Sequence, residues 1–239
     1  MRLLAVRAVP AMVLLLATAS CAGENRVAAA RREKEAGLRE RFAGLGLRYP
    51  AARLYLRAFK RERVLEMWAG PREGPLKLVR TYAIVAASGE LGPKRVEGDL
   101  QVPEGFYVVE RFNPQSRFHL SLGLDYPNAS DRVRSDRRRP GGDIFIHGGS
   151  SSIGCMALTD PVIREVYVCA ADAARPIDVH VFPCRMTDEA MKGLAKQHGA
   201  DSDLLRFWNE IRPGYTLFER ARKVPQVTVR KDGTYVVRP

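Results

Sequence analysis

Residues 144–155 read Ile144-Phe145-Ile146-His147-Gly148-Gly149-Ser150-Ser151-Ser152-Ile153-Gly154-Cys155. An apolar run ends on a histidine, and a loop of small residues leads from there to a cysteine. A thiol has a pKa of about 8.5, so a cysteine nucleophile needs a neighbouring imidazole to take its proton. The spacing predicts a strand and loop in which Cys155 is the nucleophile and His147 the base. Backbone N–H groups at Gly154 and Cys155 are expected to line an oxyanion hole.

Further motifs lie around this loop. They are Ser88–Lys94, Glu97–Asp99, Pro103–Tyr107, Asn113-Pro114, His119–Ser121, Phe207-Trp208 and Pro213–Tyr215. With Ser152-Ile153-Gly154-Cys155 they resemble the L,D-transpeptidase (YkuD-type) family, and more closely its YafK-like branch, over roughly residues 45 to 237. So broad a similarity is more specific than a lone Gly-Cys pair.

The resemblance implies roles for individual residues. Cys155 is the nucleophile, His147 the proton donor and acceptor, and Gly154 an oxyanion donor, while Ser152 and Gly148 are expected to bind substrate. The larger family has a second His before Gly-Cys and an Arg two residues after the Cys, where this chain has Ile153 and Ala157. The YafK-like branch shares both replacements.

Three other residues fall in family-like segments. Tyr107, His119 and Lys94 fit either substrate contact or support of the fold. His119 is also an alternative base, although its Phe118-His119-Leu120 setting suits a strand.

The resemblance also implies the reaction. It is acyl transfer through Cys155 on peptidoglycan stem peptides at meso-diaminopimelate, without a cofactor. An amine acceptor makes the protein an L,D-transpeptidase of cell wall biogenesis, whereas water makes it an amidase that releases lipoprotein from the wall. A non-catalytic wall-binding lipoprotein is the third reading.

The N-terminus predicts export. After Arg2 and Arg7, residues 8–19 are almost free of polar side chains, which is typical of a signal peptide over residues 1–20. Lipidation of Cys21 and ordinary cleavage near Ala19 both fit the small residues there, and both stay open. The expected location is the periplasm or cell envelope, with a membrane contact only through a lipid on Cys21.

The formal net charge of +12 favours anionic partners. Export argues against nucleic acid, whereas wall peptides carry accessible carboxylates. The densest basic run, Arg132–Arg139, fits either a substrate carboxylate site or a solvated loop.

The remaining cysteines and histidines do not predict a metal site. Cys169 and Cys184 fit either a disulfide in an oxidising compartment or two buried free thiols. The four histidines lack zinc spacing, and the chain lacks a P-loop or dinucleotide glycine pattern.

Alternating apolar segments predict a mixed α+β fold, mainly β with packed helices. Residues 21–47 are expected to be a helical or flexible tether and residues 48–239 one catalytic domain. Strands are expected at 54–59, 64–68, 76–85, 106–112, 118–124, 143–147, 177–182, 227–229 and 234–237. Helices are expected at 160–174, capped by Asp160, from Thr187 onward, and at 203–211.

Overall fold

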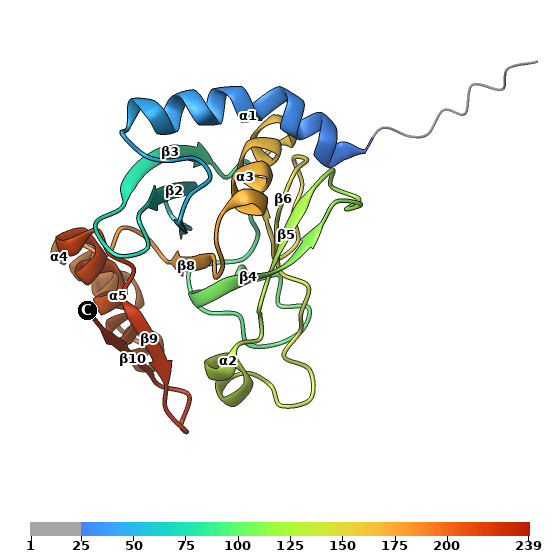
Figure 1. Ribbon diagram of the computed structural model, residues 1–239. Helices are drawn as coiled ribbons and strands as arrows, with labels where there is room; N and C mark the ends of the chain where they lie inside the picture. Colours follow the sequence, from blue (N-terminus) through green and yellow to red (C-terminus); the bar gives the residue numbers. More distant parts are fainter. Residues whose placement is uncertain (1–24) are drawn as a thin grey trace, which may run out of the picture.

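The computed structural model describes residues 25–239 of the chain (Figure 1). The predicted signal peptide, residues 1–20, and Cys21 lie outside the described residues.

An eight-stranded sheet forms the centre of the described chain. Its spatial order is β3-β2-β1-β8-β4-β5-β6-β7. The strands are β1 Arg53–Phe59, β2 Val64–Gly70, β3 Lys77–Ala83, β4 Gly105–Asn113, β5 Ser121–Leu124, β6 Phe145–His147, β7 Met156–Ala157 and β8 Asp178–Phe182. Most neighbours are antiparallel, but β1 pairs with β8, and β6 with β7, in parallel. Strands β6 and β7 are joined by the loop of residues 148–155, whereas β1 and β8 are far apart in the sequence and are brought together by the fold.

The sheet curls until its two ends meet. Just after β3, the Val85 N–H donates to the Ala157 carbonyl and the Ala157 N–H donates to the Ala86 carbonyl, both at 2.9 Å. Strand β7 is therefore held by β6 on one side and by residues 85–86 on the other. These bonds on both sides of β7 fix the position of Cys155, the residue directly before it.

Five helices cover the sheet within residues 25–239. They are α1 Arg26–Gly44, α2 Ala129–Arg134, α3 Asp160–Asp172, α4 Asp188–His198 and α5 Ser202–Ala221. Helix α3 packs against β5, β6 and α1. Helices α4 and α5 gather with the hairpin of β9 Gln226–Val229 and β10 Tyr235–Arg238 on another side (Figure 1).

Helix α1 covers most of the described part of the predicted tether. Its Ala30, Leu38 and Phe42 side chains are buried in the main hydrophobic core. Arg31 forms a bidentate pair with Asp172 at the end of α3, with N–O distances of 2.7 and 2.6 Å. These contacts make α1 part of the packed domain.

The predicted fold class is confirmed as mixed α+β, and the differences from the predicted elements are local. Asp160 does not cap α3, because Thr159 holds the cap position and the Asp160 carboxylate binds a loop N–H instead. Helix α5 extends past Pro213 to Ala221. The run Arg132–Arg139 begins inside α2, a short helix that the sequence analysis did not predict.

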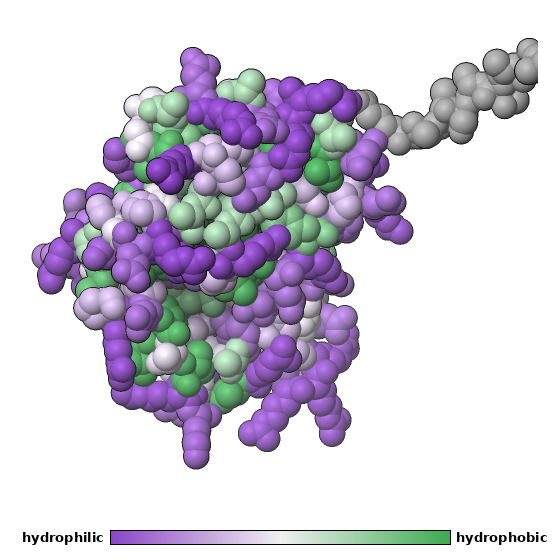
Figure 2. All heavy atoms as spheres, viewed as in Figure 1, coloured by the Kyte–Doolittle hydropathy of each residue, from purple (hydrophilic) through white to green (hydrophobic). Residues whose placement is uncertain are grey.

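Hydrophilic side chains project from most of the face seen in Figure 2, with apolar patches between them. Among residues 25–239, no helix is long and apolar enough to span a bilayer.

Candidate active site

Strands β6 and β7 bring His147 and Cys155 together. Ile146 pairs with Met156 and His147 with Ala157, so Cys155, directly before β7, lies next to Phe145. Side chains alternate between the two faces of a sheet, and paired residues share a face. The side chains of His147 and Cys155 therefore project from the same face of neighbouring strands, since His147 follows Phe145, the neighbour of Cys155, by two residues. This is the arrangement that the sequence motif predicts.

The Cys155 thiol rests on the backbone that precedes β6. Its Sγ accepts from the Phe145 N–H at 3.4 Å and donates to the Asp143 carbonyl at 3.5 Å. Burial raises the pKa of the Cys155 thiol; the Phe145 N–H lowers that pKa, Asp143 raises it and Lys94 lowers it. Donation from Sγ to the Asp143 carbonyl requires the thiol proton, and the raised pKa favours this protonated form.

The His147 imidazole is arranged as a base. A carbonyl only accepts hydrogen bonds, so Nδ1 carries the proton that it donates to the Gly148 carbonyl at 2.6 Å. In the neutral ring Nε2 is then free to accept a proton. Burial lowers the pKa of His147 more than the bond to Gly148 raises it. Among residues 25–239 no hydrogen bond links this ring to Sγ.

The N–H groups expected to line the oxyanion hole already have partners. The Gly154 N–H donates to the Ser88 hydroxyl at 2.7 Å, and the Cys155 N–H donates to the Ser152 hydroxyl at 3.0 Å. Ser152 Oγ in turn donates to the Cys155 carbonyl at 2.6 Å. Ser152 thus holds the nucleophile's backbone, and an oxyanion bound here would share these N–H groups or displace a hydroxyl.

Gly148 and Gly149 follow His147 and contact the start of α3. A Cβ at Gly148 would lie 2.5 Å from Asp160 Oδ1 and 2.8 Å from the Phe118 carbonyl, which no side chain tolerates. The Gly149 N–H donates to Asp160 Oδ1 at 2.7 Å. In this state the buried Gly148 packs inside the protein, and Asp160 anchors the loop that leaves the histidine.

The other residues singled out from the sequence have contacts within the protein. Lys94 Nζ pairs with Asp99 at 2.5 Å and is buried. The Tyr107 hydroxyl donates to the Glu104 carbonyl at 3.2 Å. His119 Nε2 accepts from Arg164 at 2.9 Å, which occupies the nitrogen that an alternative base would need.

Cys169 and Cys184 are free and buried in separate core clusters. The open choice between a disulfide and two free thiols is therefore answered in favour of free thiols. No group of three metal-ligating side chains occurs within the described part of the chain.

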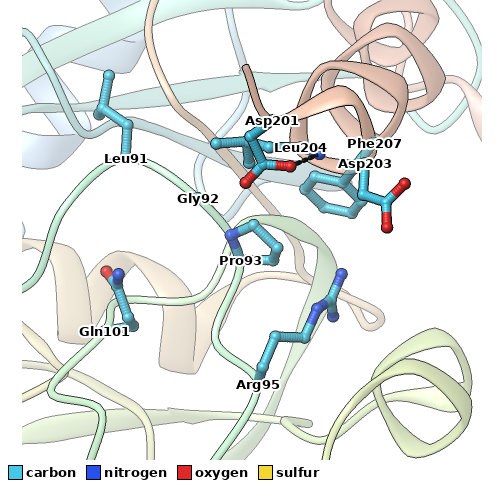
Figure 3. A pocket seen from close by; sticks show the side chains of 9 residues that line it. All are labelled: Leu91, Gly92, Pro93, Arg95, Gln101, Asp201, Asp203, Leu204 and Phe207. Carbon is cyan, nitrogen blue, oxygen red and sulfur yellow. Dashed lines mark hydrogen bonds between the residues drawn. The ribbon is translucent and has the colours of Figure 1, made fainter. Parts of the chain in front are cut away.

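A hollow of about 350 Å³ lies between the segment around Leu91–Arg95 and the start of α5 (Figure 3). Asp201 caps α5 there by accepting from the Leu204 N–H at 2.9 Å. Neither Cys155 nor His147 lines this hollow. The geometry of β6 and β7, rather than concavity, identifies the candidate active site.

Sequence reasoning missed four residues that contact the motif. They are Ser88, Phe118, Asp143 and Asp160. Ser88 lies in a family-like segment, and Asp160 follows the cysteine closely, so both carried a sequence signal. Phe118 and Asp143 carried none; they lie in the loops that precede β5 and β6, and the packing of these loops brings them to the site.

Comparisons with known proteins agree with this geometry. The family model described as YkuD, L,D-transpeptidase catalytic domain, matches residues 56–179, just over half of the chain. "Putative L,D-transpeptidase YafK" from Escherichia coli (strain K12) is 38% identical over 190 residues, which cover 77% of this chain and 73% of that protein. The protein of that name from Escherichia coli O157:H7 has the same identity and coverage.

Two solved structures give weaker matches. The helical cell shape determining protein Pgp2 from Campylobacter jejuni is 17% identical with a TM-score of 0.48, covering 81% of this chain and 80% of its own. Bd1075 from Bdellovibrio bacteriovorus is 18% identical with a TM-score of 0.42, covering 70% of this chain and 63% of its own. The family-model match and the 38% identical relative show that the chain belongs to the L,D-transpeptidase family, in its YafK-like branch.

Proposed function

We propose that the protein is an exported, cysteine-dependent L,D-transpeptidase that acts on peptidoglycan stem peptides at meso-diaminopimelate. The observation that carries this proposal is the placement of Cys155 and His147 on one face of β6 and β7, with His147 Nε2 free to accept a proton. Family membership supports the substrate class.

Catalysis begins from a neutral pair. The Cys155 thiol leaves the Asp143 carbonyl, to which it donates at 3.5 Å, and turns toward His147. Nε2 takes the thiol proton while Sγ attacks the carbonyl carbon that meso-diaminopimelate contributes to the scissile amide. The resulting imidazolium gives its proton to the leaving amine as the C–N bond breaks. A thioester on Cys155 and a free amine result.

The second half restores the enzyme. An acceptor amine attacks the thioester carbonyl, Nε2 takes the proton of that amine, and the C–S bond breaks to return the Cys155 thiol after reprotonation. Water in place of the amine gives hydrolysis, the amidase alternative. Gly154 and Cys155 N–H groups support the oxyanion in both halves once the Ser88 or Ser152 hydroxyl shares or yields its bond.

The test is incubation of the purified protein with stem tetrapeptides that end in meso-diaminopimelate and D-alanine. Intact-protein mass spectrometry should find an acyl adduct on Cys155, and product analysis should find crosslinked or exchanged peptides. If the only product is tripeptide formed by uptake of water, the protein is a hydrolase and not a transpeptidase. A lipoprotein-linked wall fragment as second substrate checks the amidase directly.

Two variants make this test specific. Cys155→Ala should abolish the adduct and the turnover, whereas Cys184→Ala, which removes a free thiol from another core cluster, should keep both. Unchanged turnover in Cys155→Ala would overturn the proposal, whereas the absence of both adduct and turnover in the unmodified protein would favour the non-catalytic wall-binding reading.

Export and anchoring are proposed from the N-terminal sequence. Mass spectrometry of the mature protein from a bacterial envelope fraction tests them. A lipid-modified Cys21 supports an anchor, an unmodified terminus near residue 20 supports a periplasmic protein, and an intact Met1 would contradict export.

A further inference from the structure

Arg111 lies in the same row of the sheet as the nucleophile. It pairs with Gly123 on β5, and Gly123 pairs with Phe145 on β6. Phe145 in turn lies beside Cys155, since its N–H donates to Sγ at 3.4 Å. Residues paired across neighbouring strands point to the same face of the sheet. Arg111 and Cys155 thus share the face that carries His147.

A β-bulge places Arg111 on this face. The register of β4 against β5 shifts between Val109, which pairs with Leu124, and Arg111, which pairs with Gly123. In a regular ladder Glu110 would be opposite Gly123. A bulge adds one residue to one strand and redirects the side chains that follow it. It therefore places a cation, rather than a carboxylate, in the row of the nucleophile.

Gly123 makes room for the Arg111 side chain. A Cβ at Gly123 would lie 3.1 Å from Phe145 Cε1 and 3.2 Å from Arg111 Cβ. Across this glycine the guanidinium carbon lies 4.9 Å from the centre of the Phe145 ring. Arg111 consequently extends along the sheet toward Cys155 instead of straight into solvent.

Asp143 contacts both Arg111 and the Cys155 thiol. Its Oδ1 accepts from Arg111 Nη2 at 2.7 Å, and its carbonyl accepts from Cys155 Sγ at 3.5 Å. The two charged side chains remain accessible, with 55% of Arg111 and 80% of Asp143 exposed. An ion pair in solvent is weak, so a ligand with both charges readily exchanges with it.

We propose that Arg111 and Asp143 form a subsite that binds a zwitterionic amino-acid group of the substrate, the carboxylate on Arg111 and the ammonium on Asp143. This inference rests on the proposed function, which places a stem peptide at Cys155. The free end of a meso-diaminopimelate side chain carries these two charges on one carbon. A guanidinium matches a carboxylate through two parallel hydrogen bonds, and the neighbouring Asp143 carboxylate accepts from the ammonium.

The test measures binding without turnover. In the Cys155→Ala protein, titration calorimetry compares a stem tetrapeptide whose meso-diaminopimelate side-chain carboxylate is free with the same peptide amidated there. The free peptide should bind about tenfold more tightly, because a charge-assisted pair is replaced by a neutral contact. Adding Arg111→Gln should remove this preference, and adding Asp143→Asn should weaken the binding of both peptides.

Arg206→Gln is the matched control. Arg206 pairs with Asp203 on the surface of α5, also as an exposed Arg–Asp pair, and its loss should leave the preference intact. Equal binding of the two peptides by Cys155→Ala, or a preference that survives Arg111→Gln, would overturn the subsite.

Acyl transfer by the protein with Cys155 intact is measured separately. If the protein transfers acyl groups but its binding shows no carboxylate preference, the subsite is contradicted and the proposed function stands. If binding shows the carboxylate preference but no acyl transfer occurs, the subsite stands and the proposed function is contradicted.

Discussion

The ring of Phe118 lies on the imidazole of His147, with ring centres 4.5 Å apart and planes inclined by 32°. Phe118 is itself 43% exposed, so it forms part of the cover between the histidine and solvent. Burial is the main cause of the lowered pKa of His147.

Phe118→Ala should therefore shift the pH dependence of acyl transfer. A folded pKa below 6.5 keeps His147 neutral, and thus competent as a base, down to lower pH. Removing the ring hydrates the imidazole and raises its pKa toward 6.5, so the acid limb of the pH–rate profile should move upward. Activity at pH 6 should then fall relative to pH 8.

Phe118→Leu is the control for this change, because it keeps an apolar cover over the ring. Its acid limb should stay near that of the unmodified protein. An acid limb that does not move in Phe118→Ala would show that other groups bury the histidine.

Of the two glycines that flank β6, we expect only Gly148 to be sensitive to substitution by alanine. Gly148→Ala places a Cβ 2.5 Å from Asp160 Oδ1 and 2.8 Å from a backbone carbonyl, so it should destabilise the protein by about 1–3 kcal/mol. Gly142 has nothing within 4 Å of the same position, and Gly142→Ala should stay within about 0.5 kcal/mol. Urea denaturation of both variants checks the difference, and equal stabilities would contradict the close packing after His147.

Asp160 should act as a positioning residue for the catalytic loop. Asp160→Ala leaves the Gly149 N–H without its acceptor and should cost about 1–3 kcal/mol. Because the loop begins at His147, kcat for acyl transfer should fall while KM changes little. Asp160→Asn keeps an acceptor oxygen and should restore most of kcat. Equal loss of kcat in both variants would point to the charge instead of the hydrogen bond.

The sequence predicted those features of this molecule that depend on local pattern. The apolar run before His147 and the small residues before Cys155 were enough to predict a strand, a loop and the catalytic pair. Strand positions such as 54–59 and 177–182 followed from apolar, β-rich composition. The family resemblance then supplied the fold, because its motifs are spread over most of the chain.

Features that depend on long-range register were beyond the sequence. Ser88 bonds to Gly154 across 66 positions, and this bond occupies an N–H that the motif alone leaves free. The bulge before Arg111 is a property of the pairing of β4 with β5, which composition does not encode. Helix α1 looked like a tether because its apolar residues are few and widely spaced, yet Phe42 is fully buried.

Arg57 and Glu66 form a buried ion pair and are only 1% and 3% exposed. Glu66 Oε2 accepts from Arg57 Nη2 at 2.7 Å and from the Trp68 indole at 2.8 Å. Glu66→Gln leaves the Arg57 charge without this partner, and Glu219 at 2.8 Å replaces it in part. Loss of one partner of a buried pair costs roughly 3–5 kcal/mol, so unfolding should occur at clearly lower urea concentration.

The pH dependence of this loss identifies its electrostatic origin. Burial acts to raise the pKa of Glu66, but the charge of Arg57 and the bonds from Trp68, Arg57 and Arg185 together lower it. A lowered folded pKa stabilises the protein above the unfolded value of about 4.3, and that contribution disappears as the pH falls through the folded value. The stability difference between the unmodified protein and Glu66→Gln should thus be full at pH 7 and shrink below about pH 4. Glu97→Gln, which breaks an exposed pair with Arg139, should cost about 0–1 kcal/mol. A difference for Glu66→Gln that stays constant down to pH 3 would assign the loss to packing rather than to the charge of the pair.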